Sequence, residues 1–301
     1  MSSTTPRHIV VAMNPRASFG KNENAGIEVS QLLSKAGHDV VTARESSYQD
    51  LEISARDALR QDSVLVVVGG DGMVHLGVNL AREKGVALGV IPSGTGNDFA
   101  RHLGIPLTSL SDAVEHFLGA LKSSPRSVDL GVAGMENGDE YPFACVLSAG
   151  FDALVNERAN NLPFPKGRHR YTLALLIELA QLKPLEYTLT LDGVKEKGTF
   201  LLVAVANSRS FGGGMKVTPD ASLEDGLLDV FTLDPLSRLN FLRIYPRVFK
   251  GQHVSDRRVH IRRASRIRVE SPGVVAYADG ERLGPLPTEV SVEPGALRVY
   301  A

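Results

Sequence analysis

Residues 64–72 read Val-Leu-Val-Val-Val-Gly-Gly-Asp-Gly, and residues 88–101 read Leu-Gly-Val-Ile-Pro-Ser-Gly-Thr-Gly-Asn-Asp-Phe-Ala-Arg. Each stretch begins as a buried strand and ends in a loop of small residues ahead of a helical pattern. Glycines let the backbone approach a ligand closely, and a helix start presents N–H groups suited to phosphate. Two such loops at the carboxyl ends of parallel strands converge on one crevice, where open α/β sheets bind ligands. The alternative for each loop is a tight strand–helix turn with a capping acid.

The first third of the chain alternates strand and helix patterns. Apolar runs rich in Val and Ile alternate with helical spacing that ends at Gly37 and Gly85. This order predicts a parallel sheet with helices on both faces. The predicted strands are 9–13, 40–41, 64–68 and 87–91, and the predicted helices are 23–36, 51–60 and 73–84.

After about residue 128 the pattern changes to short apolar segments separated by turn signals such as Asp192-Gly193 and Asp279-Gly280. It predicts an antiparallel, β-rich domain. We therefore expect an α/β domain over 1–128 and a β-rich domain over 129–301, with 289–301 a candidate to return to the first domain. The predicted strands are 141–147, 187–191, 200–206, 228–233, 266–269 and 274–278, and the predicted helices are 170–182 and 238–249.

Composition excludes several classes of protein. The 301 residues carry 33 Lys and Arg against 34 Asp and Glu, a balance that argues against nucleic acid as the partner. The single cysteine, Cys145, excludes an internal disulfide framework and a cysteine-cluster metal site. The first apolar run, 9–13, is shorter than the ~7–15 residues of a signal peptide. The longest, 171–182, is below the ~20 residues of a membrane span. We expect a cytoplasmic protein without a transmembrane segment.

The two loops also resemble a known family. Gly69-Gly70-Asp71-Gly72 followed by residues 92–101 is similar to the catalytic domain shared by diacylglycerol kinases, sphingosine kinases and bacterial lipid kinases, and most similar to the soluble bacterial diacylglycerol kinases. The likeness continues in order over nearly the whole chain. The further motifs that carry it are 148–152, 211–214, 219–221, 225–229 and 279–281.

This resemblance implies an ATP- and Mg²⁺-dependent lipid kinase that converts diacylglycerol to phosphatidic acid. It implies an N-terminal three-layer α/β nucleotide domain followed by an antiparallel β-sandwich that carries the lipid site. Glu281, in the Asp-Gly-Glu turn, corresponds to the family's general base. The expected nucleotide contacts are Asn14, Pro15, Arg16, Ala17, Ser18, Thr42, Gly69, Gly70, Asp71, Gly72, Met73, Val74, His75 and Thr95.

Two sets of residues are candidates for magnesium. Asp71 would repel a phosphate unless a cation lies between them, so Asp71 and Asp98 are the candidates for a metal–water network, supported by Arg101. The resemblance implies a structural magnesium held by Ser222, Asp225 and Leu227; a hairpin without metal is the alternative.

The chain departs from the family at one motif. Where the family continues with Thr-x-Asn-Glu, this chain has Met73-Val74-His75-Leu76, which removes a hydroxyl and a carboxylate near the phosphates. A catalytically weak nucleotide-binding regulator is therefore one alternative. A kinase of another lipid alcohol, such as a sphingoid base, is the other.

The expected partner is diacylglycerol or a similar lipid at a membrane surface. Residues 241–270 contain nine basic residues against Asp256 and Glu270, an excess that would favour peripheral contact with anionic headgroups. A solvated charged face is the alternative, and a homodimer is compatible with the sequence.

Overall fold

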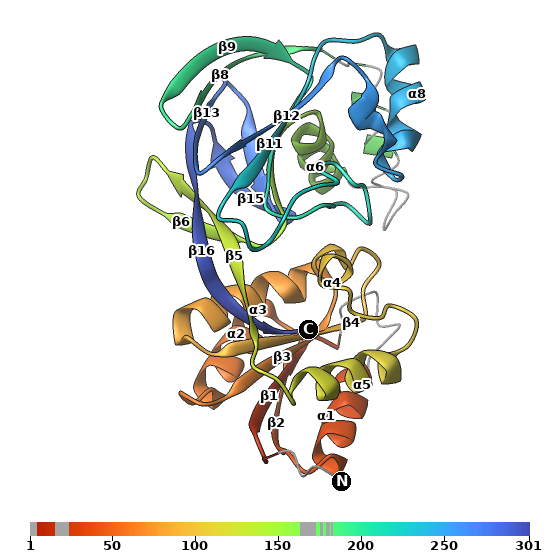
Figure 1. The fold of residues 1–301 in the computed structure, drawn as a ribbon, viewed down its shortest axis with the longest axis vertical. Helices are drawn as coiled ribbons and strands as arrows, with labels where there is room; N and C mark the ends of the chain where they lie inside the picture. Colours follow the sequence, from red (N-terminus) through yellow and green to blue (C-terminus); the bar gives the residue numbers. More distant parts are fainter. Residues whose placement is uncertain (1–4, 16–23, 163–172, 175–176, 179–180, 182) are drawn as a thin grey trace. The chain divides into compact units, whose positions relative to one another are not determined.

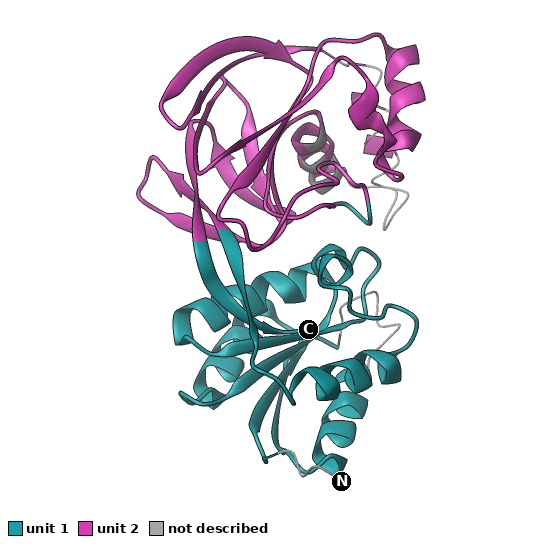
Figure 2. Cartoon of the chain, viewed as in Figure 1, with its two compact units in different colours: residues 1–130, 212–214, 294–301 teal, residues 131–211, 215–293 magenta. Residues whose placement is uncertain are grey.

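The structure is a computed structural model that describes residues 5–15, 24–162, 173–174, 177–178, 181 and 183–301. The chain divides into two compact units (Figure 2). Unit 1 consists of Met1–Leu130, Gly212–Gly214 and Pro294–Ala301, and unit 2 consists of Gly131–Phe211 and Met215–Glu293.

Unit 1 is built on a parallel sheet in the order β2-β1-β3-β4. Every residue of β1 and β3 is buried, which explains their continuous Val-rich runs. The last residues of the chain join this sheet beside β4, where Val299 pairs with Leu88 and Tyr300 with Gly89 in parallel. The strands are β1 (His8–Met13), β2 (Asp39–Arg44), β3 (Val64–Gly69) and β4 (Ala87–Pro92).

Helices cover both faces of this sheet (Figure 1). α1 contacts α5 on one face, and α2 contacts α3 on the other. The Ser47 hydroxyl caps α2, and Gly85, with φ of 62°, ends α3 as expected. The predicted three-layer α/β architecture is therefore confirmed, although α5 was not predicted. The helices are α1 (Ala25–Lys35), α2 (Tyr48–Ala58), α3 (Asp71–Lys84), α4 (Asp98–Leu103) and α5 (Leu110–Ala120).

Unit 2 is an antiparallel β-sandwich, as predicted. One sheet has the order β12-β11-β10-β7-β14-β15, and in the other β13 pairs with β8 and with residues 288–291 of β16. Residues of both sheets, among them Val203, Val230, Leu189 and Ile267, form one buried core. The strands are β5 (Arg126–Met135), β6 (Glu140–Phe143), β7 (Val146–Gly150), β8 (Leu185–Leu191), β9 (Val194–Phe200), β10 (Leu202–Ala206), β11 (Leu228–Leu233), β12 (Val259–Ala264), β13 (Arg266–Glu270), β14 (Val275–Ala278), β15 (Glu281–Pro285) and β16 (Thr288–Tyr300).

In the part of unit 2 that the structure describes, the helices with defined bounds are α6 (Phe151–Asn161), α8 (Arg238–Val248) and the short 3₁₀ helix η2 (Gln252–Ser255). α8 matches the predicted helix over 238–249, whereas α6 was not predicted. The helix predicted over 170–182 lies largely outside the described residues. No helix in the described part of the chain combines the length and apolar character needed to cross a bilayer.

Tyr300 offers a test of how the chain terminus contributes to unit 1. Its ring is 4% exposed and meets the Phe117 ring edge-on with centroids 6.2 Å apart. We expect Tyr300→Ala to lower the free energy of unfolding by about 3 kcal/mol, because it leaves a cavity beside β4. Urea unfolding followed by circular dichroism measures it. Ile53→Ala, at a side chain 55% exposed, is the control and should change little. An equal effect of the two substitutions would contradict the inference that burial of Tyr300 stabilises unit 1.

Candidate active site

The two glycine loops of unit 1 touch backbone to backbone. Gly69 at the end of β3 pairs with Pro92 at the end of β4, and the Ser93 N–H donates to the Gly69 carbonyl at 2.8 Å. A Cβ on Gly94 would lie only 2.4 Å from the Gly70 Cα, so position 94 requires glycine, and a Cβ on Gly70 would lie 3.1 Å from the Gly94 Cα, a tight contact. The structure thus brings together the two loops whose convergence the parallel order predicted.

Asp71 links the first loop to the start of α4. Its Oδ2 accepts the Asn97 N–H at 3.1 Å, and its Oδ1 accepts the Asp98 N–H at 2.9 Å. Asn97 adopts a left-handed conformation with φ of 55°, and its side chain exchanges two hydrogen bonds with the backbone of Gly94. Burial raises the pKa of Asp71, and the backbone N–H groups oppose that rise.

Asp98 in turn holds a segment that is distant in sequence. Its side chain is buried, its Oδ2 accepts the Gly213 N–H at 2.8 Å, and its Oδ1 accepts the Gly214 N–H at 2.7 Å. These bonds attach Gly212–Gly214 to unit 1. Arg101 donates to the Gly96 carbonyl at 3.1 Å and so supports the second loop. Its role in a metal–water network stays a prediction. No pattern in the sequence indicates the link between Asp98 and these glycines.

The remaining residues predicted to bind nucleotide occupy several parts of unit 1. Asn14 and Pro15 directly follow β1, whose carboxyl end shares an edge with those of β3 and β4. Thr95 is exposed in the second loop. Thr42 lies within β2, and its hydroxyl is 2.8 Å from that of Ser30. Arg16, Ala17 and Ser18 lie outside the described residues.

The departure from the family motif lies in the first turn of α3. Met73 is 6% exposed and Leu76 is 1% exposed, and Val74 is also buried. The Met73 Cγ occupies the space that a Cβ on Gly69 would take, at 2.4 Å. These side chains fill the core of unit 1. The backbone carbonyl of His75 accepts a hydrogen bond from the side-chain amide of Asn79, one turn later in α3, at 2.8 Å. This is a local contact within the helix.

Glu281 begins β15 in unit 2, directly after a two-residue turn. Asp279 and Gly280 both have positive φ, 48° and 90°, and Ala278 pairs with Glu281 across the hairpin. The Asp279 carboxylate accepts the N–H groups of residues 144, 145 and 146 at 2.7–3.0 Å. The Glu281 side chain is exposed, and its carboxylate forms no hydrogen bond or ion pair with another described residue.

The predicted magnesium loop, residues 222–227, contains oxygen atoms of the kind that bind metal ions. The Asp225 Oδ1 accepts the Leu227 N–H at 3.2 Å, and the Ser222 hydroxyl accepts the Glu224 N–H at 3.2 Å. Arg263, which the sequence did not single out, lies beside the loop with its guanidinium 3.8 Å from Asp225. Among the described residues, no group of three or more His, Cys, Asp or Glu could hold a metal ion.

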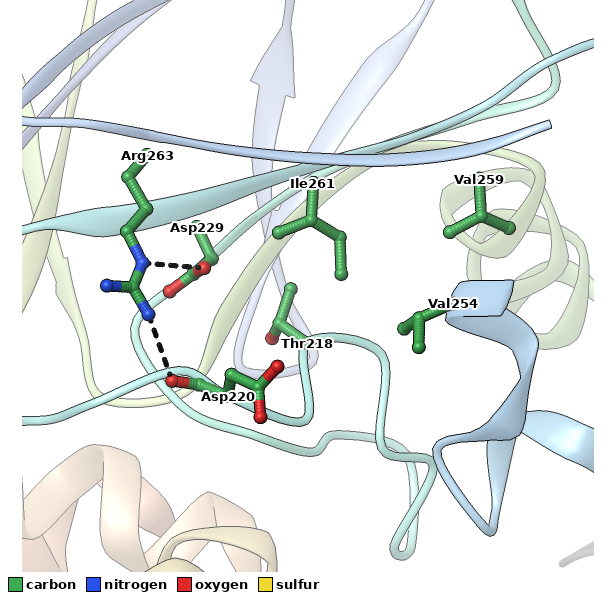
Figure 3. Close-up of a pocket in the computed structure, with 7 residues that line it drawn as sticks. All are labelled: Thr218, Asp220, Asp229, Val254, Val259, Ile261 and Arg263. Carbon is green, nitrogen blue, oxygen red and sulfur yellow. Dashed lines mark hydrogen bonds and ion pairs between the residues drawn. The ribbon is translucent and has the colours of Figure 1, made fainter. Parts of the chain in front are cut away.

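A pocket of about 440 Å³ opens next to this loop in unit 2 (Figure 3). Arg263 lines one end of this pocket, where it donates hydrogen bonds to the Asp229 carboxylate at 3.5 Å and to the Asp220 carbonyl at 3.3 Å. Burial raises the pKa of Asp229, and the guanidinium opposes that rise. One end of the pocket therefore carries acidic side chains beside the Arg263 guanidinium, and the rest of its wall is mainly apolar. Its residues are Thr218, Asp220, Asp229, Val254, Val259, Ile261 and Arg263.

Comparison with known proteins decides the family. Residues 8–133 match the model of the diacylglycerol kinase catalytic domain, and residues 145–301 match that of the YegS C-terminal NAD kinase beta sandwich-like domain. A diacylglycerol kinase of Mycobacterium tuberculosis is 38% identical over 294 residues, which cover 97% of this chain and 94% of that protein. The chain belongs to the diacylglycerol kinase family.

Other relatives agree with this membership. A diacylglycerol kinase of Bacillus subtilis is 30% identical over 87% of this chain and 86% of its own length. A Pseudomonas aeruginosa protein named "Probable lipid kinase YegS-like" is 32% identical over 79% of this chain and 76% of its own length. A solved diacylglycerol kinase structure from Bacillus anthracis shares the fold, with a TM-score of 0.72 at 19% identity, covering 98% of this chain and 96% of that one. This diacylglycerol kinase family is one of lipid kinases, and kinase activity implies ATP as the phosphoryl donor.

The glycine contact gives a testable requirement. We expect Gly94→Ala to lower the free energy of unfolding of this family member by about 1–3 kcal/mol, because the methyl group must displace the Gly70 backbone. Chemical unfolding measures it. Gly119→Ala, in the exposed last turn of α5 with open space around it, is the matched control and should stabilise by about 0.5–1 kcal/mol. Destabilisation by both, or by neither, would contradict the packing argument.

The Asp98 anchor gives a second test. We expect Asp98→Ala to speed amide hydrogen exchange at Gly213 and Gly214 by about tenfold or more, because two charge-assisted bonds are lost. Nuclear magnetic resonance resolves both amides. Asp112→Ala, at an exposed acid on α5, should leave them unchanged. Unchanged exchange in Asp98→Ala would show that the segment is held by something else.

Proposed function

We propose that this chain transfers the γ-phosphoryl group of ATP to the free hydroxyl of diacylglycerol, forming phosphatidic acid. The observation that carries the proposal is the backbone contact between Gly70 and Gly94 at the carboxyl edge of the sheet of unit 1. The loops carry no side chain at either of these glycines, which suits a ligand bound by main-chain N–H groups, as phosphates are. The names of the relatives support diacylglycerol as the acceptor.

The loops supply the groups that would hold the donor. Gly70 precedes α3, whose first N–H groups lack partners within the helix. Gly72 is exposed, with open space where a Cβ would stand, so its backbone is accessible. Thr95 adds an exposed hydroxyl from the second loop. These residues bind and orient the triphosphate, which is most of what phosphoryl transfer requires of a protein.

Glu281 is the proposed general base. Its exposed carboxylate has no hydrogen-bond partner among the described residues, and no arginine or lysine neutralises it there. It takes the proton of the acceptor hydroxyl as that oxygen attacks the γ-phosphorus. The bond between the γ-phosphorus and the bridging oxygen breaks, and ADP leaves.

Magnesium is the proposed metal, and two groups of residues fit it. The carboxylates of Asp71 and Asp98 each accept two backbone N–H groups and keep further lone pairs for ordered water. Ser222, Asp225 and the carbonyl of Leu227 offer a set of oxygen donors, which a hard cation prefers. When bound, Mg²⁺ neutralises phosphate charge.

A different lipid alcohol is the second candidate acceptor. The relative named as a YegS-like lipid kinase favours it, since its printed name specifies no acceptor. A panel of diacylglycerol, monoacylglycerol and sphingosine, offered with labelled ATP in mixed micelles, separates the two. A regulator without catalysis would bind ATP and label none of them. Restoring the family's acid as Leu76→Glu does not test that alternative, because position 76 is buried and a carboxylate there would be desolvated.

Glu281→Gln tests the proposed base. We expect a loss of about 10²–10⁴ in kcat for diacylglycerol, because the amide cannot accept the proton. ATP binding, measured by calorimetry, should be retained. Glu140→Gln, at an exposed acid of β6, is the control and should keep wild-type kcat. Equal rates for wild type and Glu281→Gln would refute the assignment.

A further inference from the structure

α8 of unit 2 is apolar on two opposite faces. Its inner face is buried: Phe241 is 7% exposed and its ring lies 4.9 Å from that of Phe151. Its outer face exposes Leu239 by 70%, Leu242 by 51% and Phe249, just beyond the helix end, by 43%. Positions 239, 242 and 249 follow helical spacing, so these side chains form one stripe along the helix. A helix at a protein surface normally places polar residues on its outer face.

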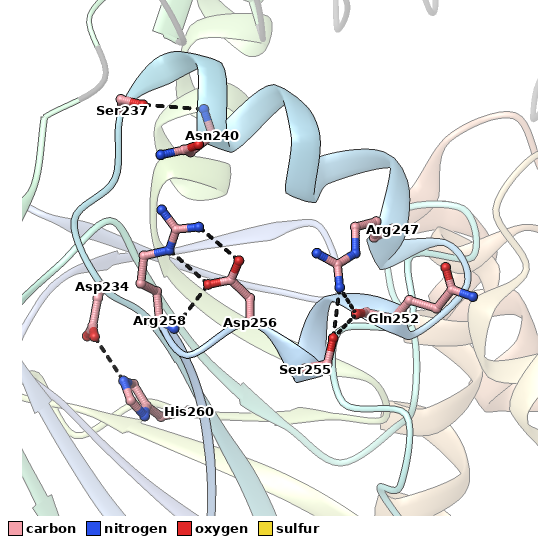
Figure 4. A network of polar contacts seen from close by, with 9 residues as sticks. All are labelled: Asp234, Ser237, Asn240, Arg247, Gln252, Ser255, Asp256, Arg258 and His260. Atoms are coloured by element: carbon pink, nitrogen blue, oxygen red, sulfur yellow. Dashed lines mark hydrogen bonds and ion pairs between the residues drawn. The ribbon is translucent and has the colours of Figure 1, made fainter.

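The segment of chain that carries this stripe is basic. Residues 235–255 contain Arg238, Arg243, Arg247 and Lys250 and no acidic residue. Arg247 bonds to the Gln252 carbonyl and the Ser255 hydroxyl, which fixes η2 against the helix (Figure 4). The other three form no ion pair with any described residue. Arg243 and Lys250 lie on the same side of the helix as Leu239 and Leu242, by their spacing.

Four of the other six arginines in 241–270 form ion pairs within unit 2, whereas Arg257 and Arg266 form none with a described residue. Arg258 pairs with Asp256 at 2.8 Å and holds the pKa of that carboxyl down at about 2 (Figure 4). Arg262 pairs with Glu196, Arg263 with Asp225 and Asp229, and Arg268 with Glu270 and Glu289. Of the five basic residues in 241–270 without an ion pair to a described residue, three therefore lie on α8 or within two residues of its end: Arg243, Arg247 and Lys250.

We propose that the outer face of α8, formed by Leu239, Leu242, Arg243, Pro246, Phe249 and Lys250, docks this chain on a membrane surface that contains anionic lipids. An amphipathic helix in the interface inserts its apolar side chains at the boundary of headgroups and acyl chains, and basic residues beside them attract anionic headgroups. The proposal rests on the proposed function for its purpose, because diacylglycerol resides in a bilayer.

A second copy of the chain fits this face less well than a membrane. In a two-fold symmetric dimer the same patch meets itself, so Arg243 and Lys250 would oppose the same residues with no acid nearby. A membrane with anionic headgroups meets both requirements at once, an apolar layer for the leucines and phosphates for the cations.

Vesicle flotation without ATP or diacylglycerol tests the docking face. The wild type should float with phosphatidylcholine vesicles that contain phosphatidylglycerol, and less with phosphatidylcholine alone. We expect Leu242→Glu/Phe249→Glu and Arg243→Glu/Lys250→Glu each to lower the partition coefficient by about tenfold or more. The matched control is Val194→Glu/Lys195→Glu at the start of β9, where Val194 is 71% exposed, and it should float as the wild type does.

Four outcomes would overturn the proposal. These are a wild type that does not float, α8 variants that float as the wild type does, a control that loses as much as they do, or a dimer in light scattering that Leu242→Glu dissociates. Failure to float while the wild type still phosphorylates a water-soluble, short-chain diacylglycerol would refute docking alone. Normal flotation without phosphorylation of any diacylglycerol would refute the proposed function alone.

Discussion

The architecture of unit 1 depends on one steric constraint, the approach of two loops so close that the second has no room for a side chain at position 94. A Cβ on Gly94 would stand 2.4 Å from the Gly70 Cα. Because β3 and β4 are parallel neighbours, their carboxyl ends present both loops at one edge. The result is a surface of bare backbone, whose N–H groups are the natural ligands of phosphate.

Two carboxylates convert that contact into an organised site. Asp71, from the first loop, binds the N–H groups that open α4, and Asp98, at the start of α4, binds those of Gly213 and Gly214. Asp71 therefore holds the start of α4, and Asp98 holds the glycine segment 212–214, which is more than a hundred residues away in sequence. Charge-assisted hydrogen bonds of this kind are stronger than those between neutral groups, so they suit a site that must be organised before substrate arrives.

The sequence predicted the parts whose cause is local. Buried Val-rich strands, helix ends at glycine and the turn at Asp279-Gly280 each follow from a pattern within a few residues, and the family motifs located the loops. It missed β9 because that strand alternates exposed and half-buried polar residues and has no apolar run. It could not reveal that Asp98 binds Gly213, since a contact between distant segments leaves no periodic signal. The Met73 side chain packs in the core, which agrees with the predicted loss of a hydroxyl at this position.

The central claim is that the glycine loops of unit 1 bind the phosphates of ATP. Hydrogen–deuterium exchange with and without a non-hydrolysable ATP analogue and Mg²⁺ tests it directly, because it reports on the main-chain N–H groups themselves. We predict that peptides covering 69–75 and 93–97 gain protection, while peptides covering β8 and β9 do not change. Protection confined to unit 2, with exchange in both loops unchanged, would contradict the account.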